Sequence, residues 1–82
     1  MPLLSLYIRH GCHLCEDMEQ HLLGLKDELC FSWKVFDVDA DKALYLKYNE
    51  MVPVLMGGEE EICHYFLDEV ALRHYLNSPT TR

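Results

Sequence analysis

Two cysteines separated by two residues are the part of this sequence best suited to chemistry. They form the motif Cys12-His13-Leu14-Cys15, which follows a short apolar segment, residues 3–8, and precedes a pattern typical of a helix. Two side chains three positions apart in the first turn of a helix lie on the same side, close enough to close a small disulfide ring. The motif therefore predicts reversible exchange between a dithiol and a disulfide.

The two cysteines are expected to differ in exposure and in reactivity. Cys12 falls at the start of the predicted helix, where unpaired backbone N–H groups and the helix dipole favour a thiolate. Cys15 begins the apolar stripe of that helix, so we expect it to be more buried and less reactive. An accessible nucleophile beside a sheltered thiol is the arrangement that thiol–disulfide exchange needs. We therefore predict that both cysteines are catalytic.

A metal site or a plain interaction module is the alternative for the same pair. With His10 or His13, the two thiolates would suit zinc or a soft metal such as Cu(I). A four-ligand zinc site needs two more ligands at compatible spacing, and Cys30 and Cys63 do not form a second CxxC. The sequence therefore favours the redox interpretation and predicts no bound metal. Cys30 and Cys63 are expected to be small buried hydrophobic side chains.

Length and charge restrict the kind of protein that carries this motif. The 82 residues allow one domain, spanning residues 1–82, and with 50% apolar residues the chain can bury a core. Seven Lys and Arg against fourteen Asp and Glu give a net charge of −7. Such an acidic surface argues against binding to nucleic acids or to anionic membranes.

The cellular location is expected to be the cytoplasm. No apolar run approaches the roughly 20 residues that cross a bilayer. Residues 1–9 lack a basic leader, and their apolar stretch is too short for a signal peptide. In a reducing compartment a structural disulfide framework is not expected, so the cysteines point to chemistry in a cytoplasmic protein, which we expect to be a monomer.

Hydrophobic patterns predict one α/β domain with the element order β-α-β-α-β-β-α. Apolar or alternating segments bounded by turn residues predict four strands, at residues 3–8, 31–38, 52–56 and 62–66. The pair Gly57-Gly58 is typical of a hairpin turn and makes the last two strands antiparallel. The first β-α-β unit must be a right-handed parallel crossover. The result is a four-stranded mixed sheet flanked by helices on both faces.

Three helices are predicted from apolar spacing and capping residues. The first is indicated by apolar residues at steps of three and four, Cys15, Met18, Leu22, Leu25 and Leu29. Gly24 weakens it by about 1 kcal/mol relative to Ala but does not end it. Asp39-Ala40-Asp41 offers carboxylates to cap a short second helix, and Asp68 caps the last, which stops at residues 77–79. The side chains expected to face inward from the last two helices are Ala43, Leu44, Leu46, Tyr48, Ala71, Leu72, Tyr75 and Leu76.

The chain resembles the thioredoxin superfamily and, within it, the small bacterial glutaredoxin-like proteins. The resemblance extends over roughly residues 3–76 and rests on four landmarks in order: Cys12-x-x-Cys15, Asp37-Val38-Asp39, Leu44 with Tyr48, and Val52-Pro53-Val54-Leu55. Each landmark is weak alone, but the ordered set is specific for the fold. The resemblance implies a thioredoxin-like fold and a thiol–disulfide oxidoreductase.

The resemblance also implies which residues meet the substrate. In that family the proline equivalent to Pro53 is cis and lies against the CxxC motif, so the backbone of Val52 would pair with an extended segment of a partner. Arg9 stands where many glutaredoxins carry a lysine that helps to bind glutathione, although a solvated charge at a strand end explains it equally well. His13 either stabilises the thiolate or is neutral and exposed.

The sequence departs from typical glutaredoxins where they bind glutathione. They place a Gly-Gly pair and an Asp after the fourth strand, whereas here the corresponding residues 62–68 contain no glycine. The acidic run Glu59-Glu60-Glu61 is a further obstacle to an anionic tripeptide. We therefore expect a protein disulfide or another small thiol as the substrate and doubt tight glutathione binding. The reaction needs no cofactor, and its electrons would come from glutathione, thioredoxin or a reductase.

Overall fold

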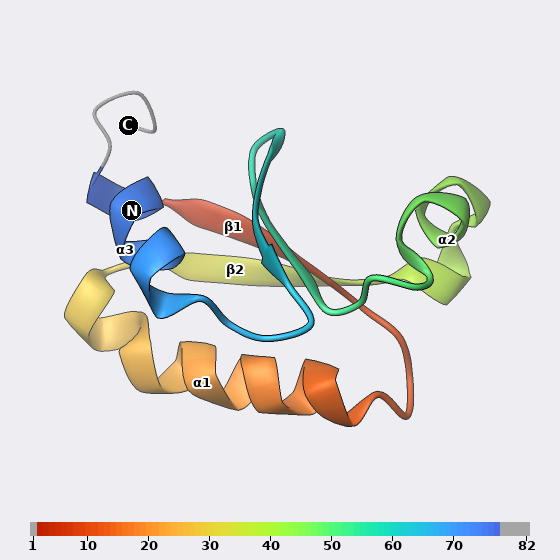
Figure 1. Ribbon diagram of the computed structural model, residues 1–82, viewed down its shortest axis with the longest axis horizontal. Helices are drawn as coiled ribbons and strands as arrows, with labels where there is room; N and C mark the ends of the chain where they lie inside the picture. Colours follow the sequence, from red (N-terminus) through yellow and green to blue (C-terminus); the bar gives the residue numbers. More distant parts are fainter. Residues whose placement is uncertain (1, 78–82) are drawn as a thin grey trace.

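The computed structural model describes residues 2–77, and its elements follow the predicted order (Figure 1). The strands are β1 (Leu3–Ile8), β2 (Ser32–Asp37), β3 (Val54–Gly57) and β4 (Glu60–His64). The helices are α1 (His13–Leu29), α2 (Lys42–Tyr48) and α3 (Glu69–Asn77), with the 3-10 turn η1 (Val38–Ala40) between β2 and α2. Among these described residues no helix has the length and apolar character needed to span a membrane.

The strand register brings the ends of all four strands that lead to the site together at one end of the sheet. The order is β2-β1-β3-β4, with β1 and β2 parallel and the other pairs antiparallel, which confirms the mixed sheet. Ile8 lies opposite Asp37, Tyr7 opposite Val54, and Val54 opposite His64. The segments after β1, after β2, before β3 and after β4 therefore all leave the sheet at the same end.

The sheet separates two apolar clusters, as the alternation of strand side chains requires. Helices α1 and α3 cover one face, and the buried residues there are Leu4, Leu6, Met18, Leu22, Leu25, Phe31, Leu55, Cys63, Leu72 and Leu76. Helix α2 and η1 contribute to a smaller cluster on the other face, formed by Val38, Tyr48, Val54 and Met56. Figure 1 shows α1 along the lower side of the sheet and α2 at its right-hand end. The prediction of helices on both faces is confirmed.

The β3–β4 hairpin differs from its prediction by one residue at the turn. Gly57 is the last residue of β3 and lies opposite Glu60, so the turn consists of Gly58 and Glu59. Gly58 has φ +63°, a left-handed conformation that glycine adopts without steric cost. The β3 strand begins at Val54 rather than at 52, and β4 ends at His64 because Tyr65 takes φ +65° and leaves the extended region.

Helix α2 buries fewer side chains than predicted. Its seven residues make only about two turns, which present one narrow stripe to the sheet. Leu44 and Tyr48, four positions apart, lie on that stripe. Ala43 is exposed, and 68% of Leu46 is exposed, so the prediction that both face inward is wrong.

The last two helices are each capped by an aspartate, as predicted. Asp41 Oδ1 accepts hydrogen bonds from the N–H groups of Ala43 and Leu44, at 2.9 and 3.2 Å. Asp68 Oδ1 accepts one from Ala71 N–H at 3.0 Å and so starts α3. Helix α3 ends at Asn77, and the predicted stop at residues 78–79 lies outside the described residues.

Removing the cap of α3 is expected to destabilise the fold. Asp68→Ala leaves the Ala71 N–H in the first turn of α3 without its acceptor and should lower the free energy of unfolding by about 1 kcal/mol. Asp27→Ala is the matched control, because the Asp27 carboxylate is exposed and forms no hydrogen bond with residues 2–77. Urea unfolding followed by circular dichroism measures both variants. Equal stability of the two would contradict the capping role.

Candidate active site

The start of α1 places a sulfur atom where a backbone donor is unpaired. After β1 the chain turns through Gly11, whose φ of +73° suits glycine, and reaches Cys12 as the N-cap of α1. Cys12 Sγ accepts a hydrogen bond from Cys15 N–H at 3.2 Å, and the Cys12 carbonyl accepts one from Glu16 N–H at 3.2 Å. A donor aimed at the sulfur stabilises a thiolate there when the pair is reduced.

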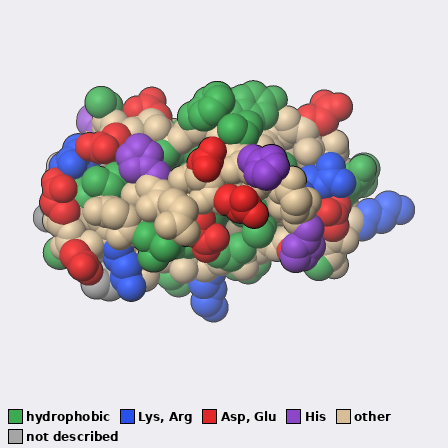
Figure 2. All heavy atoms as spheres, turned by 90° about the horizontal axis from the view of Figure 1, so that it is seen from below, with side chains coloured by type: hydrophobic (Ala, Val, Ile, Leu, Met, Phe, Trp, Pro, Cys, Tyr) green, Lys and Arg blue, Asp and Glu red, His purple; other side chains and the backbone are tan. Residues whose placement is uncertain are grey.

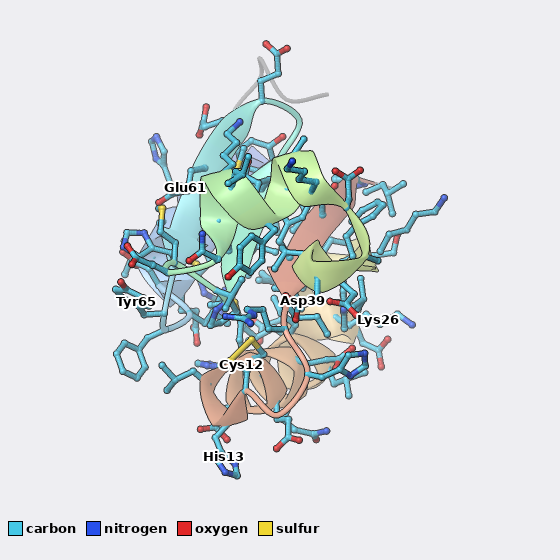
Figure 3. The ribbon with its side chains drawn as sticks, turned by 90° about the vertical axis from the view of Figure 1, so that its right-hand side faces the viewer. Cys12, His13, Lys26, Asp39, Glu61 and Tyr65 are labelled. Atoms are coloured by element: carbon cyan, nitrogen blue, oxygen red, sulfur yellow. A yellow bond between two sulfur atoms is a disulfide. The ribbon has the colours of Figure 1, made fainter. Side chains whose placement is uncertain are left out.

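The two predicted catalytic cysteines are brought together as a disulfide (Figure 3). Their Cα atoms are 5.2 Å apart, within the range that a disulfide spans. Cys15 is only 3% exposed, whereas Cys12 is half-buried, so Cys12 presents the more accessible sulfur. Both residues line an open hollow of about 110 Å³ between the β1–α1 loop and α1. The predicted difference in exposure is confirmed.

The basic side chains next to the cysteines pair with two aspartates, one at the end of β2 and one in η1. Arg9 lines the hollow with Cys12, but its Nε lies 3.2 Å from Asp39 Oδ2, and its guanidinium sits over the Tyr45 ring at 5.3 Å. His10 Nε2 lies 3.0 Å from Asp37 Oδ2. The structure therefore places Arg9 beside the predicted site with its charge already paired.

His13 does not turn toward the sulfur atoms. Its side chain is 95% exposed, with Nδ1 at 3.7 Å from Glu16 Oε2. Figure 3 shows it pointing away from the disulfide, below α1. The structure places His13 within the motif but at its outer surface.

Val52 and Pro53 lie at the end of the sheet from which β1 leads to Cys12. They are joined by a cis peptide bond, as the family resemblance implies. Pro53 is buried and Val52 half-buried. The backbone of Val52 forms no hydrogen bond with residues 2–77. Its N–H and C=O groups are therefore available to an extended partner strand.

Tyr65 belongs to this end of the molecule, although the sequence analysis predicted for it only a place in the fourth strand. Its N–H donates to the Pro53 carbonyl at 3.0 Å, and its hydroxyl donates to the Glu50 carbonyl at 2.8 Å. These bonds join the residue after β4 to the segment before β3. In the view of Figure 3, Tyr65 and Asp39 lie on opposite sides of the disulfide.

The other two cysteines differ from each other. Cys63 is buried as predicted, and this burial raises the pKa of its thiol. Cys30 is exposed, so the prediction for it is wrong. It is the C-cap of α1 with φ +55°, a left-handed end that turns the side chain out of the helix stripe. In the part of the chain that the structure describes, no three His, Cys, Asp or Glu side chains form a group able to hold a metal.

The two free thiols are expected to react at different rates in the oxidised protein. Cys30 should be alkylated by iodoacetamide at least about tenfold faster than Cys63, because exposure and thiolate content control the rate. Burial raises the folded-state pKa of Cys63, so the neutral thiol stabilises the fold below the unfolded-state pKa. That contribution is lost as the pH rises through the folded-state value. Mass spectrometry at several pH values measures the alkylation rate of each cysteine. Equal rates for Cys30 and Cys63 would contradict the prediction.

Comparison with known proteins identifies the family of this chain. The family model described as "Glutaredoxin-like domain (DUF836)" matches residues 3–77. The chain belongs to this family. The solution structure of protein Ne2328 from Nitrosomonas europaea is 40% identical, with a TM-score of 0.83 over 94% of each chain. The structure of XcR50 from X. campestris is 32% identical, with a TM-score of 0.67 over 93% of this chain and 99% of that one.

These likenesses confirm the resemblance to the thioredoxin superfamily and its α/β fold. No curated protein matches the chain. A glutaredoxin-like domain with a Cys12–Cys15 pair at disulfide distance fits a thiol–disulfide redox role.

Proposed function

We propose that this glutaredoxin-like domain is a dithiol oxidoreductase that reduces disulfides in other proteins. The observation that carries the proposal is the position of the Cys12 sulfur at the N-terminus of α1. This sulfur accepts a hydrogen bond from the N–H of Cys15 and forms a disulfide with the sulfur of that buried cysteine. The open hollow beside both cysteines supports it, since a substrate sulfur must reach Cys12.

The reaction uses the two sulfur atoms in turn. The Cys12 thiolate attacks a substrate disulfide, a mixed disulfide forms, and the second substrate sulfur leaves as a thiolate that takes a proton from water. Cys15 loses its proton and attacks the Cys12 sulfur, which breaks the mixed disulfide and releases the substrate as a dithiol. The protein is left with the Cys12–Cys15 disulfide. Glutathione or a thioredoxin-like dithiol then supplies the two electrons that reduce it.

The surrounding residues have supporting roles in this proposal. The backbone N–H and C=O groups of Val52, the residue before Pro53, are unpaired within residues 2–77 and would form strand-like hydrogen bonds with the substrate. Arg9 and His13 would contact it at the rim, Arg9 from the hollow and His13 from the exposed first turn of α1. No metal or organic cofactor takes part.

We also propose a cytoplasmic location, which the chemistry of the cysteines supports. Cys30 is exposed and unpaired, and an oxidising compartment would convert such a thiol into adducts or intermolecular disulfides. A reducing compartment keeps it free and supplies the electrons. We propose that the protein acts there as a monomer.

Reaction of the reduced protein with a peptide disulfide tests the proposal. We expect one peptide disulfide to be reduced per protein molecule and a Cys12–Cys15 disulfide to appear, both measured by mass spectrometry. The double variant Cys30→Ser with Cys63→Ser is the matched control and should keep this stoichiometry. An intact peptide disulfide, or near-stoichiometric zinc or copper in protein purified without chelator, would contradict the proposal and favour a metal carrier.

A further inference from the structure

A second hollow lies on the other side of the CxxC motif, between α1 and the loop after β4. It has a volume of about 140 Å³, and its walls include Leu14, Asp17, Tyr65 and Phe66. Leu14 is an inner residue of the CxxC motif itself. Tyr65 is hydrogen-bonded to the Pro53 carbonyl. The hollow is therefore bounded by the two segments that flank the proposed site of exchange.

The hollow exposes apolar surface that this chain does not cover. Phe66 is 69% exposed and Tyr65 41% exposed. Figure 2, which views the molecule from the α1 side, shows hydrophobic side chains projecting from its upper edge, with acidic and histidine side chains below them. Large aromatic side chains that share a hollow with Leu14 of the CxxC motif are costly to leave in water, and a group of them indicates an interaction site.

The charge beside this apolar surface is negative and unpaired. The Asp17 carboxylate in the wall forms no ion pair or hydrogen bond with residues 2–77. The histidine in the wall, His21, lies 3.5 Å from Glu69 Oε1 and is therefore already engaged. With a net charge of −7 on the whole chain, this rim attracts cations and repels anions.

We propose that this hollow docks a segment of the disulfide substrate that has a large apolar side chain next to its cysteine and a Lys or Arg beyond that. The apolar side chain would fill the space between Leu14 and Phe66, and the cation would face Asp17. This inference rests on the proposed function and names the substrate class of the same site: cationic, apolar polypeptides rather than an anionic tripeptide.

Four peptide disulfides that differ only in the two residues after the cysteine test the inference. The pairs are Leu-Lys, Leu-Glu, Ser-Lys and Ser-Glu, with bis(2-hydroxyethyl) disulfide as a small substrate that has neither feature. We expect the second-order rate constant with reduced protein to be about tenfold higher for Leu-Lys than for Ser-Glu. Added salt should reduce the preference for Lys over Glu but not the preference for Leu over Ser.

Two surface variants separate the contributions. Phe66→Ser should reduce the Leu-over-Ser ratio, and Asp17→Asn should reduce the Lys-over-Glu ratio. Each ratio is measured on one variant, so a general loss of activity cancels. Val70→Ser is the matched control, because Val70 is an exposed apolar residue of α3 outside the hollow, and it should keep both ratios.

The outcomes distinguish this inference from the proposed function. Reduction of bis(2-hydroxyethyl) disulfide with equal rates for all four peptides would overturn the docking site and leave the oxidoreductase proposal intact. Reduction of none of the five disulfides would overturn both. A preference for Ser-Glu would also overturn the docking site, because it would require a cationic, polar hollow.

Discussion

Cys12→Ser is expected to abolish disulfide reduction, whereas Cys15→Ser should stop the reaction one step later. A serine hydroxyl is not ionised at neutral pH and does not attack a disulfide, so without Cys12 no mixed disulfide forms. Without Cys15 the first attack still occurs, because the more accessible sulfur and its N-cap position are unchanged. The mixed disulfide then persists, since the neighbouring thiol that resolves it is missing.

The measurement is the mass of the protein after incubation with an excess of a peptide disulfide. Cys15→Ser should gain the mass of one peptide, which dithiothreitol removes, and Cys12→Ser should gain none at position 15, where the sulfur is buried. Cys30→Ser in the Cys15→Ser background is the matched control, because Cys30 is an exposed thiol far along α1 from the motif. An adduct that disappears with Cys30→Ser would show that the wrong cysteine had reacted.

The features predicted correctly from the sequence are those set by neighbours along the chain. The spacing of Cys12 and Cys15 brings their side chains together wherever a helix begins just after Cys12, as α1 does. The caps at Asp41 and Asp68 act over two or three residues and were predicted for the same reason. Period-two and period-3.6 patterns then placed the strands and helices to within a few residues.

The features that the sequence did not reveal depend on contacts between distant segments. Arg9 was equally compatible with a substrate contact and with solvent, and its bond to Asp39 spans 30 residues of chain. Tyr65 takes a left-handed φ and reaches back to Glu50 and Pro53. Such pairings follow only from the register of β1, β2, β3 and β4, which brings one end of each of these strands together.

Cys30 illustrates a different limit of the sequence. Cysteine is one of the residue types most often buried, so burial was the reasonable expectation for an unassigned one. The outcome was decided by the last turn of α1, where a left-handed C-cap directs the side chain into solvent. The apolar character of a residue predicts burial only when the position lies inside the helix stripe.

The second large effect is expected at Gly57, where an added methyl group requires the Tyr75 ring to move. A Cβ at this position would overlap the far end of the Tyr75 ring, which lies over the sheet from α3. The ring of Tyr75 packs against the main core cluster, so Gly57→Ala must displace it from this packing. We expect the free energy of unfolding to fall by about 1–3 kcal/mol, the usual cost of overfilling a packed site.

Two matched variants test whether the ring is the cause. In a Tyr75→Leu background the overlapping ring atoms are gone, so adding Gly57→Ala should cost little or even stabilise β3, since glycine in a strand is unfavourable by about 0.5–1 kcal/mol relative to alanine. Gly24→Ala makes the same change in α1, where no atom of residues 2–77 outside the neighbouring helix backbone lies within 4 Å of the new methyl group, and should stabilise the protein by about 1 kcal/mol. Urea unfolding of the four proteins of the cycle gives the coupling free energy between positions 57 and 75. A coupling near zero would mean that the fold accommodates the methyl group in some other way, and that the close approach of α3 to β3 does not depend on glycine.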